Sequence, residues 1–192
     1  MKIYTKTGDA GETGLMGGKR VRKDDPYMDA LGSIDELNAV LGVTITHLND
    51  EDHWSEEVKA ILERVQHELF TLGADIAASV DKPVLSPRIT AQHVIGMEQI
   101  IDKFESQLKI PQHFILPGGT KTSAFLHLCR TVGRRAERDV VTLASHIRLN
   151  PEIVQYLNRL SDMLYVLARY ANREAEAKEQ QPIYKYLGNK EV

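Results

Sequence analysis

Five stretches of this chain repeat apolar residues at helical spacing, and this periodicity limits its possible architecture more than any other feature. The clearest stretch runs from about residue 55 to 78, with apolar positions alternating steps of four and three: Val58, Leu62, Val65, Leu69, Leu72 and Ile76. Such a repeat lines one face of a helix and is typical of helices packed at shallow angles. It predicts a long helix in a bundle.

Four further segments carry the same signal, at about residues 26–48, 90–108, 121–145 and 150–177. Three of the helices are expected to begin at caps: Asp25 before Pro26, Thr90, and Asn150 before Pro151. Four or five long helices with short connections make an up-down bundle, so the chain is predicted to be all-α and a single domain. Extended pieces are expected only at residues 2–5 and 114–116, and a polar tail at residues 178–192.

The first 24 residues, called the leader below, are rich in glycine and basic side chains. Glycine recurs at every third position, at Gly8, Gly11, Gly14 and Gly17, and within residues 1–23 six Lys or Arg face two acidic residues in a chain of formal net charge −3. Glycine lets backbone N–H groups surround an anion, and threonine and basic side chains add donors and countercharge. The alternative is a solvated terminus. The charge contrast favours a phosphate-binding loop.

Any nucleotide held by this loop is bound without a Walker A motif. That motif needs a glycine five residues before its Gly-Lys pair and Ser or Thr after the pair. Thr13 and Arg20 stand at these positions around Gly18 and Lys19. The basic patch is also too small for the broad basic surface that nucleic-acid binding usually requires, so a small anionic ligand is expected.

Bulk properties are those of an ordinary soluble domain, with 42% hydrophobic and 27% charged residues among 192. The one cysteine, Cys129, excludes an internal disulfide and is expected to be buried and inert. Because the sequence has no apolar run of transmembrane length and no signal-peptide pattern, we expect a cytoplasmic protein without a membrane partner.

Three predicted helices carry polar groups near their apolar faces. Asp35 and Asn38 lie one turn apart on the first helix, and Asn158 and Asp162 lie one turn apart on the fifth. The fourth helix carries a mainly basic stripe of Arg130, Arg134 and Glu137, flanked by Arg135 and Arg138. A solvated surface explains each set alone, since exposed ion pairs contribute only about 0.3–0.5 kcal/mol. Arginine, however, suits two-pronged recognition of phosphate. A second anion-binding surface is therefore favoured on the fourth helix.

Two observations leave alternatives open. The segment Phe114 to Gly119 is an apolar loop that can be a core plug or the wall of a ligand site. Glu98, Asp102 and Glu105 are the nearest approach to the carboxylate set of an all-helical nucleoside triphosphate pyrophosphohydrolase. A non-catalytic bundle that binds nucleotide is the other alternative. The histidines show no metal-ligand spacing, and no metal site is predicted.

Taken together, the motifs resemble the corrinoid adenosyltransferases of the propanediol-utilisation type, over almost the whole chain. The resemblance rests on five motifs in order: residues 5–9 through Lys19-Arg20, then 32–38, 116–119, 129–138 and 157–162. It implies a five-helix bundle that assembles as a homotrimer with active sites between subunits. It also implies transfer of the 5′-deoxyadenosyl group of ATP to the cobalt of cob(I)alamin, with release of triphosphate.

The resemblance carries over specific roles. It implies that the leader and two helices contact ATP through Thr5, Lys6, Thr7, Gly8, Asp9, Ala10, Gly11, Glu12, Thr13, Lys19, Arg130, Arg134, Arg135, Glu137 and Asn158. Arg134 and Lys6 would stabilise the departing triphosphate, and Arg130 would pair with Asp35 across the subunit boundary. Phe114 would lie beside the corrin ring, where it keeps the lower axial ligand of cobalt away.

The chemistry needs alignment and charge stabilisation more than proton transfer. Cob(I)alamin is itself a strong nucleophile, so no general base is required, and in-line positioning can supply about 7–11 kcal/mol. Donors aimed at the developing negative charge supply the rest. We expect Mg²⁺ to accompany ATP, and a reductase and a B12-dependent enzyme as protein partners.

Overall fold

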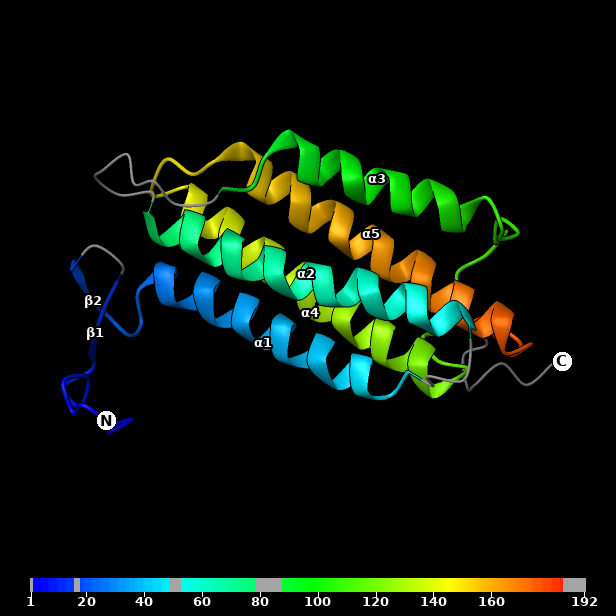
Figure 1. The fold of residues 1–192 in the computed structure, drawn as a ribbon, viewed down its shortest axis with the longest axis horizontal. Coiled ribbons are helices and arrows are strands. Elements are labelled where there is room, and N and C mark those ends of the chain that lie inside the picture. Colours follow the sequence, from blue (N-terminus) through cyan, green and yellow to red (C-terminus); the bar gives the residue numbers. More distant parts are fainter. Residues whose placement is uncertain (1, 16–17, 49–52, 79–87, 185–192) are drawn as a thin grey trace, which may run out of the picture.

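The computed structural model describes residues 2–15, 18–48, 53–78 and 88–184 of the chain. Five helices make up most of it: α1 (Pro26–Thr46), α2 (His53–Ala78), α3 (Ala91–Glu105), α4 (Lys121–Ala144) and α5 (Pro151–Glu174). Consecutive helices run in opposite directions (Figure 1), so the predicted up-down bundle of five helices is confirmed. In the described parts of the chain, no helix is long and apolar enough to cross a membrane.

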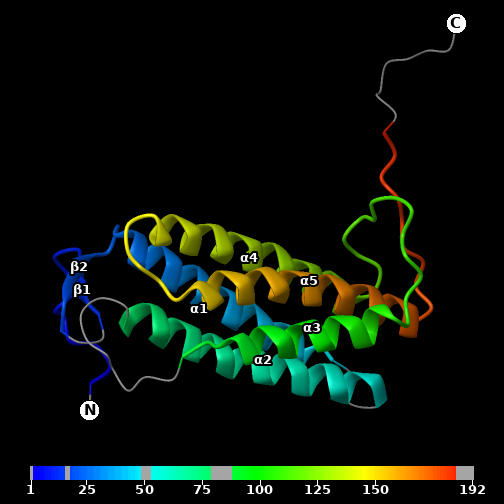
Figure 2. The same cartoon turned by 90° about the horizontal axis from the view of Figure 1, so that it is seen from above.

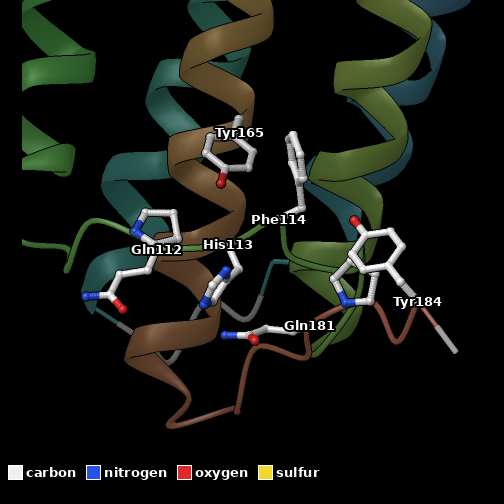
Figure 3. Close-up of a pocket in the computed structure, with 8 residues that line it drawn as sticks. Gln112, His113, Phe114, Tyr165, Gln181 and Tyr184 are labelled. Carbon is white, nitrogen blue, oxygen red and sulfur yellow. The ribbon is translucent and has the colours of Figure 1, made fainter.

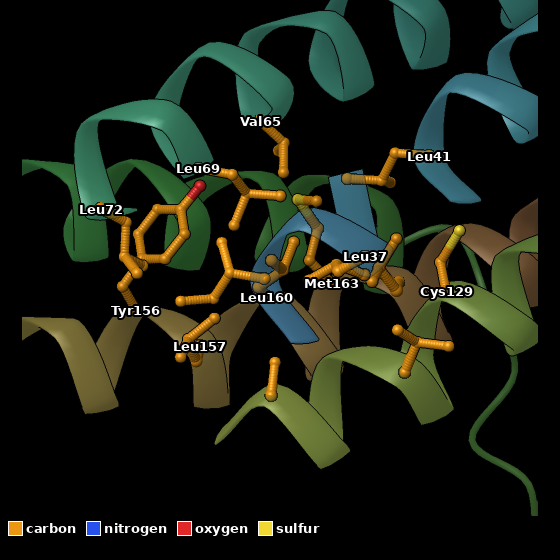
Figure 4. Close-up of a cluster of buried hydrophobic side chains, with 14 of the residues drawn as sticks. Leu37, Leu41, Val65, Leu69, Leu72, Cys129, Tyr156, Leu157, Leu160 and Met163 are labelled. Carbon is orange, nitrogen blue, oxygen red and sulfur yellow. The ribbon is translucent and has the colours of Figure 1, made fainter. Parts of the chain in front are cut away.

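Helix α5 lies at the centre of the bundle. It packs against α4 on one side and α3 on the other, while α1 packs between α4 and α2. Figure 2, turned by 90°, shows the same arrangement. Leu157, Leu160 and Met163 of α5 meet Leu37 of α1 and Leu69 of α2 in a continuous hydrophobic core (Figure 4).

The apolar repeat that opened the sequence analysis is fully used in packing. All six of its members on α2 are buried, the most exposed being Leu69 at 1%. Helices α1 and α4 come close where Gly133 faces Leu37, since a Cβ at Gly133 would lie 3.7 Å from a Leu37 methyl group. Cys129 is also buried, and burial raises the pKa of its thiol to about 11.

The predicted caps are present, and helix boundaries differ from expectation by at most three residues. Asp25 Oδ1 accepts the Tyr27 N–H at 2.9 Å, and Asn150 Oδ1 accepts the Glu152 N–H at 3.2 Å. Thr90 precedes α3 as expected, and its N–H donates to His93 Nδ1 at 3.1 Å. Such side chains satisfy the free backbone groups at helix ends.

The leader is more ordered than the sequence suggested. Residues 2–5 and 114–116 form no strand; the strands are β1 (Glu12–Gly14) and β2 (Arg20–Arg22), paired antiparallel with Thr13 opposite Val21. Leu15 and Val21 are each 8% exposed and join the core cluster, so two apolar side chains of the leader pack onto the bundle. The glycine spacing hid this hairpin, because glycine is usually depleted in strands.

Candidate functional site

Backbone hydrogen bonds and two left-handed residues shape the first part of the leader into a compact turn. The Asp9 N–H donates to the Lys6 carbonyl at 3.4 Å, and the Gly11 N–H donates to the Gly8 carbonyl at 3.2 Å. Lys6 has φ 63° and Gly11 has φ 84°, in the region that favours glycine. The Lys23 N–H closes the turn on the Gly11 carbonyl at 2.8 Å. Gly17 lies outside the described residues.

Basic side chains surround this turn. Arg20 donates from Nη2 to the Thr7 carbonyl at 2.9 Å and from Nε to Glu12 Oε2 at 3.2 Å. The Lys23 ammonium lies over Gly8, where an added Cβ would be 3.3 Å from it. Thr5 and Thr7 share a hydroxyl hydrogen bond of 2.9 Å.

Most ligand-contact residues predicted in the leader are open to solvent: Thr5, Lys6, Thr7, Asp9, Ala10, Gly11, Glu12 and Lys19 are exposed, and Gly8 and Thr13 are half-buried. The Lys19 ammonium lies 5.9 Å from the centre of the Tyr27 ring, at the start of α1. Tyr27 itself is buried. The leader therefore offers hydroxyls, ammonium groups and backbone at its surface while its base is anchored in the bundle.

The basic stripe of α4 is present and is only partly neutralised within the chain. Arg135 forms an ion pair with Glu36 of α1. Arg134 is exposed and Arg130 half-buried, and among the described residues neither guanidinium has a carboxylate partner. Burial lowers the pKa of Arg130, and the nearby Arg134 lowers it further. Two neighbouring cations lacking countercharge favour an anionic ligand or a partner carboxylate.

A hydrogen-bonded set links α4 to α5 beside this stripe. Asn158 Nδ2 donates to Glu137 Oε1 at 3.1 Å, and Arg159 Nη1 donates to Asn158 Oδ1 at 2.8 Å. Arg159 also pairs with Glu98 of α3 at 2.9 Å. Asn158 and Glu137 are thus brought together, as the prediction that both face one ligand requires.

Asp35 lies on a different face of the bundle. It is exposed on α1 and lines a groove of about 570 Å³ whose other members include Asn38, Glu63 and Phe70. Asn38 Oδ1 is buried there without a hydrogen-bond partner among the described residues. Asp35 and Arg130 form no ion pair with each other within the described parts of one chain.

Phe114 lines a pocket of about 640 Å³. Its ring is 82% exposed, and Figure 3 shows it flanked by Tyr165 of α5 and Tyr184 of the C-terminal segment. Of the two roles left open for this loop, the wall of a ligand site therefore fits and a core plug does not. An exposed aromatic ring at a concave, partly apolar surface is typical of binding sites for large flat ligands.

Sequence reasoning missed two side chains beside this pocket. His127 is 3% exposed, its Nδ1 accepts from Arg130 Nε at 3.4 Å, and its ring meets that of Tyr165 edge-on at 6.0 Å. Burial lowers the pKa of His127 to about 4, and Arg130 adds to this effect. Arg169, the second, is 8% exposed. A histidine and an arginine within apolar helical stripes were the available signals.

The leader and the Phe114 pocket lie at opposite ends of the bundle (Figures 1 and 2). Helix α4 runs between the two ends, and its 24 residues span about 36 Å at about 1.5 Å per residue. One chain therefore does not bring its own leader to its own Phe114.

The carboxylates considered for a metal-dependent pyrophosphohydrolase are not arranged to hold a metal ion. Glu98, Asp102 and Glu105 line a pocket of about 350 Å³, but Arg159 occupies the Glu98 carboxylate. Across the described residues, no group of three or more His, Cys, Asp or Glu side chains is arranged to hold a metal ion.

Comparison with known proteins gives consistent matches. A family model described as cobalamin adenosyltransferase matches residues 3–171. The chain is 41% identical over 172 residues to a corrinoid adenosyltransferase of Bacillus subtilis, covering 90% of this chain and 87% of the relative. It is 44% identical over 172 residues to a cobalamin adenosyltransferase of Cupriavidus metallidurans, covering 90% and 89%.

A solved structure is similar over its full length. It is that of a variant PduO-type ATP:corrinoid adenosyltransferase from Lactobacillus reuteri, complexed with cobalamin and ATP. The TM-score is 0.88 at 35% identity, and the match covers 94% of this chain and 99% of that one.

Proposed function

The chain belongs to the cobalamin adenosyltransferase family and adenosylates a corrinoid from ATP, and we propose that the leader and the α4 arginines hold ATP while Phe114 and its pocket hold the corrinoid. The observation that carries this assignment is the pair of sites at opposite ends of the bundle, one cationic and one aromatic. Each has the chemistry of one substrate.

At the ATP site, the chain's own groups bind and orient the triphosphate. Thr5, Thr7 and the backbone of the Lys6–Gly11 turn present hydroxyl and N–H groups, and Lys6, Lys19 and Arg134 supply positive charge. As the cobalt–carbon bond forms and the bond from carbon to the triphosphate oxygen breaks, negative charge collects on the departing group. Fixed cations stabilise that charge more than they stabilise bound ATP.

At the corrinoid site, Phe114 and Tyr165 offer an apolar wall to the macrocycle. Phe114 is 82% exposed before binding. Covering it with an apolar part of the ligand favours binding, because the apolar surface of the ring is removed from water. Phe114 would also exclude a polar ligand from the lower face of cobalt. The rate acceleration therefore comes from positioning the two substrates, and no proton transfer by a side chain is required.

We propose that the two sites meet in a homotrimer. One chain separates its leader from its Phe114 by the length of the bundle, so the leader of one subunit would face the pocket of the next. Arg130, which has no carboxylate partner among the described residues, would then pair with Asp35 of the neighbouring subunit. Sedimentation of the purified protein tests this assembly, and a monomer that turns over would contradict it.

Mg²⁺ would travel with ATP. Such an ion is commonly held chiefly by phosphate oxygens and water, where it would neutralise part of the triphosphate charge. A cytoplasmic location remains a prediction from the sequence, and a reductase that supplies cob(I)alamin and a B12-dependent enzyme that receives the product remain predictions from the family.

The deciding experiment gives purified protein ATP, Mg²⁺ and chemically reduced cobalamin, and follows the visible spectrum and the released phosphates. We expect adenosylcobalamin and inorganic triphosphate in equal amounts. Release of pyrophosphate from ATP without corrinoid would instead favour the pyrophosphohydrolase reading, and ATP binding without turnover would favour a non-catalytic bundle.

A further inference from the structure

A buried arginine on α5 holds the two segments that wall the Phe114 pocket. Arg169 donates from Nε to Glu179 Oε1 at 3.0 Å and from Nη2 to Glu179 Oε2 at 3.1 Å. The same Nη2 donates to the Lys109 carbonyl at 2.8 Å. Lys109 belongs to the connecting loop between α3 and α4 (residues 106–120), and Glu179 to the C-terminal segment (residues 175–184).

Both segments then run directly into the pocket. The connecting loop contributes Pro111 to Phe114 and the C-terminal segment contributes Gln181, Pro182 and Tyr184. Between them, the Leu116 N–H donates to the Gln180 carbonyl at 2.7 Å. The far end of the loop is fixed by Asn172, whose Nδ2 donates to the Gly118 carbonyl at 2.9 Å.

The Arg169 guanidinium also lies 5.9 Å from the centre of the Tyr165 ring. Tyr165 is the residue by which α5 itself lines the pocket. The buried side chain of Arg169 therefore contacts all three wall-forming segments, and its contact with Glu179 is bidentate and charge-assisted. Such contacts fix orientation as well as adding free energy.

We infer that Arg169 and Glu179 form a positioning pair for the corrinoid site, setting the distance between the Phe114 loop and the C-terminal segment. This inference rests on the proposed function. Neither side chain lines the pocket, so the pair acts through the walls that it holds. Without it, Phe114 and Tyr184 lose their relative placement while the leader, at the other end of the bundle, keeps its own.

The test compares Michaelis constants for the two substrates in three variants. Glu179→Gln removes the charge with little change in shape, Arg169→Lys keeps the charge but loses the two-pronged geometry, and Arg169→Gln/Glu179→Gln removes both. We expect the KM for cob(I)alamin to rise about tenfold in each single variant, with the KM for ATP unchanged. Because the pair acts as a unit, the double variant is expected to be no worse than the worse single one.

Arg173 supplies the matched control. It lies one turn further along α5, is exposed and contacts Gln107 of the same loop at 3.3 Å, but it does not touch the C-terminal segment's carboxylate. Arg173→Gln is expected to leave both KM values unchanged. A change confined to the melting temperature or to the active fraction in the Glu179 variants, with unchanged KM for cob(I)alamin, overturns the positioning role.

Failure of the inference and failure of the proposed function give different results. Wild-type protein that makes no adenosylcobalamin, or a Phe114→Ala variant with unaltered corrinoid kinetics, overturns the pocket assignment and the inference with it. An active wild type whose Phe114→Ala variant is impaired, together with Arg169→Lys kinetics equal to the wild type, overturns only the positioning pair.

Discussion

The two ends of this bundle are built differently. At the leader end, most of the polar groups assigned to ATP are exposed, and among the described residues Leu15 and Val21 anchor the hairpin in the core. At the pocket end, Arg169 and Asn172, both nearly buried, tie loop and C-terminal segment to α5. This difference indicates that a charged ligand can complete its own binding site, because it supplies the missing countercharge. A large ligand bound through apolar contacts instead needs pocket walls that are already in position before it binds.

The strongest test of whether both ends serve one reaction is Arg134, which lies between them on α4. Arg134→Ala is expected to lower kcat/KM by about 10²–10³, since it removes a charge that stabilises the departing triphosphate. The residue is exposed, so the melting temperature should stay near that of the wild type. Stopped-flow spectra of adenosylcobalamin formation measure the effect.

Arg148, exposed beyond the end of α4, is the control for that substitution. Arg148→Ala should be fully active. Wild-type rates for Arg134→Ala would show that the α4 stripe does not stabilise the departing triphosphate, and that role would then belong to the leader alone.

The pocket end should also be the more sensitive to acid. His127 has a folded-state pKa of about 4, below the 6.5 of an unfolded histidine, so the unfolded chain binds more protons between these values. Stability from this residue is present above pH 6.5 and is lost as pH falls toward 4, by about 1–2 kcal/mol between pH 7 and 5. Urea unfolding at both pH values measures it, and His127→Phe should flatten the dependence. An equal loss in the variant would assign the effect to other groups.

A substitution at Phe114 tests whether the pocket end binds the corrinoid and not ATP. Phe114→Ala is expected to raise the KM for cob(I)alamin about tenfold, or about 1.4 kcal/mol, because a ring covered on one face contributes less than the roughly 1.5–3 kcal/mol of full burial; the KM for ATP should stay unchanged. Ile110→Ala, at an 85% exposed position of the same loop that does not line the pocket, should change neither. A rise in both constants would mean that Phe114 acts on the fold.

A substitution at Gly11 is expected to weaken ATP binding alone, and its effect is the smallest of those predicted. Its φ of 84° is costly for any residue with a Cβ, by about 1 kcal/mol, so Gly11→Ala should weaken ATP binding about fivefold without altering cobalamin binding. Gly14→Ala, which adds a methyl group in open space at ordinary φ, should change ATP affinity less than twofold. Calorimetric titration with ATP compares them, and equal effects would remove backbone geometry from the explanation.

The sequence was sufficient for the bundle because one physical signal, apolar spacing, specifies it. The stripe from Val58 to Ile76 is buried as expected, and caps at Asp25 and Asn150 marked two helix starts. The β1–β2 hairpin was missed because glycine content outweighed the two apolar anchors Leu15 and Val21.

The candidate site was predictable only in part. The Arg130–Glu137 stripe follows from helical spacing, and the structure joins Glu137 to Asn158. The contact of Arg169 with Glu179 spans a helix end and an irregular segment, so no periodic pattern encodes it. Pairing of Asp35 with Arg130 stays a prediction, because it involves a second subunit.

Gly119 shows how narrow the tolerance of such an arrangement can be. A Cβ at this position would lie 2.3 Å from Asn172 Oδ1, and its φ is 102°. The same Asn172 oxygen receives the Thr120 N–H that begins α4. In a library of all single substitutions selected for growth, position 119 should therefore accept nothing but glycine, because any side chain there would collide with the Asn172 amide that holds the start of α4.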